Sequence, residues 1–110
     1  MSKTHISEIK IQVELDENRI PEKLQWNAED GGVQHEEAKA MFLALWDHKQ
    51  RESLRIDLWT KDMPLDEMKI FFYQTLVAMS DTYFKATQDE KMTATFKDFC
   101  SYFAEKLDIK

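Results

Sequence analysis

The chain has 110 residues, 33% of them charged, and a formal net charge of −6. A chain of this length forms one domain and can bury a hydrophobic core without disulfides or a structural metal. The acidic balance argues against nucleic acid or an anionic membrane as the main partner, because binding phosphate requires a basic surface. No apolar run is long enough to cross a bilayer, and the single Cys100 has no partner for an internal disulfide. We therefore expect a cytoplasmic protein without membrane insertion.

Two strand patterns open the chain. Residues 6–16 alternate between apolar and polar side chains, with Ile9, Ile11, Val13 and Leu15 on one face. This period of two predicts a half-buried strand. A weaker alternation predicts a second strand over 22–28, before the only two glycines of the chain, at positions 31 and 32, which mark a loop.

The next segment has two interpretations. The run "EEAKAMFLALW" is rich in helix-forming residues, so a helix over 38–46 is an open alternative. However, "SLRIDLW" alternates as a strand, and the polar interval before it has the length of a hairpin loop. We predict paired strands at about 38–47 and 53–60.

The pairing of this predicted hairpin follows from the length of its loop. A loop with an even number of residues places Trp46 opposite Ser53 and Leu43 opposite Ile56. One face of the hairpin then carries only aliphatic side chains and suits covering by helices. The opposite face carries the aromatic residues Phe42, Trp46 and Trp59, together with Ala44, Arg55 and Asp57.

Two helices are predicted at the C-terminus, over about 64–86 and 88–107. Both carry apolar residues at steps of three and four: Met68, Phe72, Leu76, Met79 and Tyr83 in the first, and Met92, Phe96, Phe99, Cys100, Phe103 and Leu107 in the second. The sequence "TQDE" is typical of a capping box, with Thr87 as N-cap and Glu90 three residues later. The predicted fold is a single α+β domain over 1–110, a four-stranded antiparallel sheet followed by two helices.

An acidic cluster precedes the first predicted helix. Asp62 lies close enough to cap free backbone N–H groups, and Pro64 suits the first helical position. Asp66 and Glu67 fall in the first turn, where the helix dipole stabilises carboxylates. No histidine lies nearby to complete a general acid–base pair. We interpret the cluster as a helix start.

Residues that could perform catalysis or bind metal are scattered. The sequence "HEEAK" begins like a zinc-protease motif, but Lys39 stands where the second histidine is required. His5 and His48 lie in separate segments, and Cys100 lies on the apolar stripe of a helix, where a buried, inert thiol is expected. We predict no catalytic residues, no metal site and no cofactor, and hence no enzyme.

The aromatic residues of the hairpin give the one candidate site. Phe42, Trp46 and Trp59 either pack on a neighbouring strand or loop, or form an exposed surface that binds a protein partner or a second copy of the chain.

Long stretches of the chain resemble one known family. They run from "SEIKIQVELDENRIPEKLQWNAEDGG" through "LRIDLWTKDMPLDEMK" to "TQDEKMTATFKDFCSYFAEKL". The sequence is similar to the gliding-motility-associated GldC family of Bacteroidota. This resemblance implies a non-enzymatic accessory protein that supports gliding, a process linked to the type IX secretion machinery, through protein–protein interaction. It implies no catalytic residues. The order of strands and helices also resembles the SecB export chaperone, so a holdase for unfolded clients is the alternative function.

Overall fold

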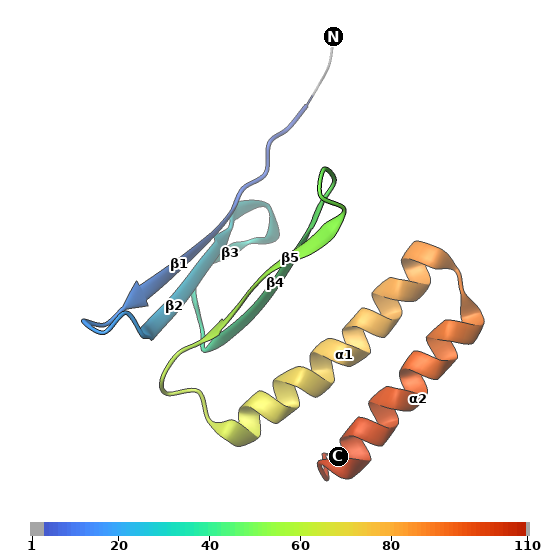
Figure 1. Ribbon diagram of the computed structural model, residues 1–110. Helices are drawn as coiled ribbons and strands as arrows, with labels where there is room; N and C mark the ends of the chain where they lie inside the picture. Colours follow the sequence, from blue (N-terminus) through green and yellow to red (C-terminus); the bar gives the residue numbers. More distant parts are fainter. Residues whose placement is uncertain (1–3, 110) are drawn as a thin grey trace. The chain divides into compact units, whose positions relative to one another are not determined.

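The computed structural model describes residues 4–109 (Figure 1). Its elements are β1 (Ile9–Leu15), β2 (Pro21–Ala28), the 3-10 turn η1 (Glu29–Gly31), β3 (Val33–Ala38), β4 (Ala40–Asp47), β5 (Glu52–Trp59), α1 (Leu65–Thr87) and α2 (Glu90–Lys106). The chain divides between Met63 and Pro64 into a strand unit and a helical unit, each compact. No helix in the described range is long and apolar enough to cross a membrane.

The first sheet is antiparallel, in the order β1-β2-β3. Ile11 lies opposite Trp26, and Val13 lies opposite Leu24, so the apolar positions of the two strands share a face. Leu24 is only 2% exposed and also lies opposite Ala38 of β3. The period of two therefore predicted β1 and β2 correctly, within a few residues at their ends.

The prediction of a single four-stranded sheet was wrong, because the chain has five strands in two antiparallel sheets. The strand that the sequence did not indicate is β3. Four of its six residues are polar, and it follows the two glycines, so its sequence is typical of a loop. Its register against β2 shifts beside Asn27, whose side-chain Oδ1 accepts a hydrogen bond from the backbone N–H of His35 at 2.9 Å. His35 has a φ of 51°, a bulge-like conformation that backbone pairing tolerates.

The second sheet is the β4–β5 hairpin, and the helical alternative for residues 38–46 is wrong. Its register is the predicted one, with Trp46 opposite Ser53, Leu43 opposite Ile56, and Met41 opposite Leu58. Asp47 closes the loop: its Oδ2 accepts from the Gln50 N–H at 3.0 Å, and its carbonyl accepts from the Arg51 N–H at 2.8 Å.

A sharp bend at Lys39 separates β3 from β4 (Figure 1). The Lys39 carbonyl accepts a hydrogen bond from the Thr60 N–H at 2.8 Å, and the next N–H, that of Lys61, donates to the Pro21 carbonyl at 3.0 Å. Thr60 is 2% exposed, and its hydroxyl donates to Asp62 Oδ1 at 2.6 Å. The base of the hairpin is thereby anchored to the start of β2.

The helical unit is an antiparallel pair of α1 and α2 (Figure 1). The buried residues of the two helices are Ser80 on α1 and Thr93 and Cys100 on α2. Small side chains let the helix backbones approach closely. Lys97 and Asp81 form an ion pair at 3.0 Å beside this contact. Burial raises the pKa of the Cys100 thiol, as expected for an inert cysteine.

Phe99 belongs to the predicted apolar stripe of α2, but it is not buried. Its side chain is 50% exposed, although its ring lies 6.1 Å from that of Phe103. The buried residues of α2 are the small Thr93 and Cys100.

The predicted helix caps were also wrong. Pro64 is the N-cap of α1 rather than its first helical residue, and Asp62 accepts from Thr60 instead of capping the helix. α1 continues through Thr87, whose hydroxyl donates to the Tyr83 carbonyl at 2.8 Å. Asp89 is the N-cap of α2, accepting from the Met92 N–H at 3.0 Å.

Candidate functional site

One face of the β4–β5 hairpin, which we call the aromatic face, brings together Phe42, Trp46 and Trp59. Strand pairing places all three on the same side, because Phe42 lies opposite Asp57 and Trp46 lies opposite Ser53. The side chains of Trp46 and Trp59 are 66% and 55% exposed, whereas Phe42 is partly buried. Exposed tryptophan is unusual on a sheet face, since solvent-facing strand positions are ordinarily polar.

The three residues are unevenly spaced along the hairpin. Trp59 is diagonal to Phe42 across the strand pair, a separation of about 7–8 Å between backbones. Trp46 lies four residues further along β4, about 13 Å from Phe42, near the hairpin loop. The aromatic face is therefore a close pair, Phe42 and Trp59, with Trp46 at the far end.

A charged pair lies between the two ends of the aromatic face. Arg55 Nη2 donates to Asp57 Oδ1 at 2.9 Å, and Arg55 lies opposite Ala44, between Phe42 and Trp46. Both charged side chains are substantially exposed, so the pair contributes little to folding stability. It places a guanidinium group on the same face of the hairpin as Phe42 and Trp46.

The opposite face of the hairpin is aliphatic. It consists of Met41, Leu43 and Leu45 on β4 and Leu54, Ile56 and Leu58 on β5. Leu45, Leu54 and Ile56 are each about half exposed or more. The hairpin thus carries exposed apolar side chains on both faces.

An ion-pair network joins segments that lie far apart in sequence. Lys61 Nζ lies 3.1 Å from Asp16 Oδ2 and 3.3 Å from Glu22 Oε1. Asp16 Oδ1 also accepts from the N–H groups of Ile20 and Asn18, at 3.0 and 2.8 Å. The bond from Ile20 and the Lys61 ammonium lower the pKa of Asp16, while Asp16 and Glu22 raise the pKa of Lys61. Sequence analysis did not identify this network, which ties the β1–β2 turn to the end of β5.

Thr60 and Asp62 form a second polar contact at the hairpin base. The Thr60 hydroxyl lowers the pKa of Asp62, and the charge of Lys39 acts in the same direction. Asp62 is therefore held by a contact within the connection that follows β5.

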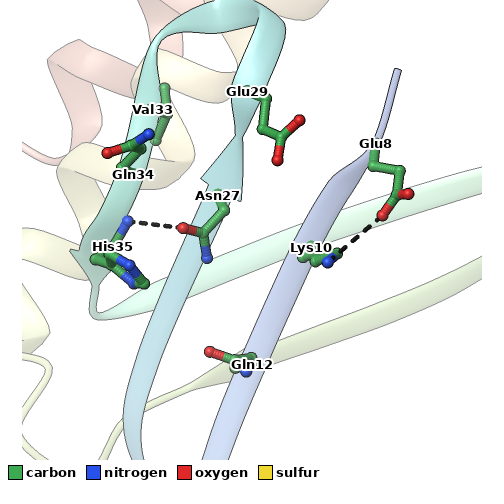
Figure 2. A pocket seen from close by; sticks show the side chains of 8 residues that line it. All are labelled: Glu8, Lys10, Gln12, Asn27, Glu29, Val33, Gln34 and His35. Atoms are coloured by element: carbon green, nitrogen blue, oxygen red, sulfur yellow. Dashed lines mark hydrogen bonds and ion pairs between the residues drawn. The ribbon is translucent and has the colours of Figure 1, made fainter. Parts of the chain in front are cut away.

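A shallow polar cavity of about 360 Å³ lies over the three-stranded sheet (Figure 2). Figure 2 shows Lys10 directed toward Glu8, with which it forms an ion pair at 3.6 Å, and the His35 backbone bonded to Asn27. His5, which does not line this cavity, pairs with Asp30 at 3.0 Å. Within residues 4–109, no group of three histidine, cysteine or acidic side chains is arranged to hold a metal ion.

Comparison with known proteins identifies the family. No curated protein and no solved structure gives a significant match to the chain. The family model described as gliding motility-associated protein GldC-like matches residues 21–109, from the start of β2 to the end of the helical unit. The match includes the whole β4–β5 hairpin and covers most of the sequence. The chain therefore belongs to the GldC-like family of gliding motility-associated proteins.

Proposed function

We propose that this protein is a non-enzymatic accessory component of bacterial gliding, which acts in the cytoplasm by binding another protein of the gliding apparatus linked to type IX secretion. Its membership of the GldC-like family supports the connection with gliding. A binding role agrees with its titratable groups, because Asp16, Lys61 and Asp62 owe their shifted pKa values to contacts that join strands and connecting segments.

The aromatic face is the surface that we assign to the partner. The observation that carries this assignment is that Trp46 and Trp59 are both more than half exposed on one side of the hairpin. Tryptophan and arginine are enriched among the residues that dominate binding energy in protein interfaces. Arg55 lies on the same face, where its pairing with Asp57 leaves further N–H donors for a partner.

Affinity purification from gliding cells tests the assignment. The double variant Trp46→Ser/Trp59→Ser should lose a protein that co-purifies with the unaltered chain. Tyr102→Ser is the matched control, because Tyr102 is a similarly exposed aromatic residue on α2, and it should retain that protein. Retention by the double variant, at equal abundance, would refute the assignment.

A second candidate is a SecB-like holdase, supported by the exposed aliphatic residues Leu45, Leu54 and Ile56. An apolar surface of this kind suits extended, unfolded clients with apolar side chains. A holdase should suppress the aggregation of unrelated unfolded proteins. A dedicated accessory protein should leave that aggregation unchanged and bind only its specific partner.

A further inference from the structure

The outer edge of β4 differs from the other sheet edges of the described chain. Four strands, β1, β3, β4 and β5, lie at an edge of their sheet. Three of them carry features that discourage pairing with another chain: Lys10 in β1, the bulge-like His35 in β3, and the charged Arg55 and Asp57 in β5. Residues 40–46 of β4 contain no charge, no proline, no glycine and no register shift.

β4 is also chemically complementary to itself. In an antiparallel pair of two β4 strands with Leu43 opposite Leu43, large residues meet small ones and apolar residues meet apolar ones. The facing positions are Met41 with Leu45, Phe42 with Ala44, Ala40 with Trp46, and Lys39 with Asp47. The last pair places opposite charges at both ends of the contact, and each such cross-strand pair is favourable.

We propose that the protein forms a homodimer in which the β4 strands of two copies pair antiparallel about a twofold axis at Leu43. Such an interface is isologous, so each favourable pair occurs twice. The two hairpins become one sheet in the order β5-β4-β4-β5, which is more stable than an isolated two-stranded hairpin.

Neighbouring registers of the same strand pair are worse. Moving the twofold axis to Phe42 places Lys39 opposite Leu45, and moving it to Ala44 places Asp47 opposite Met41. An axis between residues would place aliphatic positions of one copy against aromatic positions of the other. The register centred on Leu43 alone matches both the charges and the faces.

The other edge of the hairpin is a weaker candidate for pairing. Two β5 strands could match Arg55 with Asp57, but these residues are already paired within each strand at 2.9 Å. The same register would also place Arg51 opposite Lys61, two like charges. Pairing through β4 avoids both problems.

This dimer goes beyond the proposed function, because it uses the edge of β4 rather than the exposed rings of the aromatic face. It also extends that face, since Phe42 and Trp46 of both copies would lie on the same side of the joined sheet. A partner would then meet two symmetric sets of aromatic residues.

Light scattering and sedimentation of the purified chain give the first test. The expected mass is twice the 13.1 kDa of one chain, and a monomer at all concentrations, or an open-ended aggregate, would overturn the proposal. Lys39→Glu and Asp47→Lys should each weaken the dimer about ten-fold, because each places like charges opposite one another at both ends. The double variant should recover much of the affinity, and failure to recover in a folded protein would contradict the register. Lys49→Glu, the same charge reversal in the exposed hairpin loop, should leave the dimer unchanged.

Cysteine cross-linking tests the position of the axis, in chains that carry Cys100→Ser. Leu43→Cys should form a disulfide between copies under mild oxidation, because facing strand residues lie within the required distance. Leu45→Cys is more exposed but should not, since its counterpart in the second copy lies about 13 Å further along the strand. Faster cross-linking of Leu45→Cys, or none at Leu43→Cys, would overturn the proposal. A monomeric Lys39→Glu protein that still binds its partner would leave the proposed function intact, so the two proposals fail separately.

Discussion

Replacing Ser80 with leucine tests the close contact between α1 and α2. Ser80 has no exposed surface, and its hydroxyl donates to the Val77 carbonyl of its own helix at 2.7 Å. The neighbouring Asp81 pairs with Lys97 of α2, so this turn of α1 lies beside α2. A leucine here must push the helices apart or adopt a strained rotamer, because the site has room only for a small side chain.

The expected loss is about 1–3 kcal/mol, the usual range for overpacking a well-packed core. For a chain of this size that corresponds to a fall of about 5–20 °C in the midpoint of thermal unfolding, measured by circular dichroism. Ala78→Leu is the matched control, because Ala78 is exposed on the same helix, and its effect should be within about 0.5 kcal/mol. Equal midpoints for the two variants would refute the close helix contact.

Three further predictions follow from the described contacts. Asp89→Ala should destabilise the protein by about 0.5–2 kcal/mol in urea unfolding, because it removes the side-chain cap of α2, whereas Glu90→Gln should have little effect. The pKa of Asp16 is lower in the folded than in the unfolded state, so Asp16 stabilises the fold above its unfolded pKa of 3.8, and this stabilisation is lost as the pH falls through the folded pKa. Asp16→Asn should therefore reduce the loss of stability at acid pH. An unchanged dependence of stability on pH would contradict the network with Lys61. Cys100 should react slowly with a thiol reagent in the native protein and rapidly in denaturant, and rapid native labelling would contradict its burial.

The hairpin was the part of the fold that the sequence predicted best. Alternation defined its two faces, and the even loop length selected the register that places Leu43 opposite Ile56. Both signals depend only on residues close together in sequence, so they can be recognised without knowledge of the rest of the molecule. The residues of the aromatic face could therefore be assigned to one side, although their exposure and spacing could not.

Non-local features could not be predicted in this way. β3 has too few apolar side chains to produce an alternating pattern, and it is held in the sheet by backbone pairing with β2. Lys61 and Asp16 are separated by 45 positions, so no sequence spacing indicates their contact. The α2 cap was misplaced since Thr87 and Asp89 are both favourable N-cap residues, and only the continuation of α1 through Thr87 selects Asp89.

Gliding by cells that carry Trp46→Ser/Trp59→Ser is the most direct test of the proposed role of the aromatic face. Both side chains are more than half exposed, so their loss should change folding stability little and leave the protein at normal abundance. The account predicts that these cells lose gliding, while cells with Tyr102→Ser glide normally. Normal gliding by the double variant, at the abundance of the unaltered protein, would contradict the account.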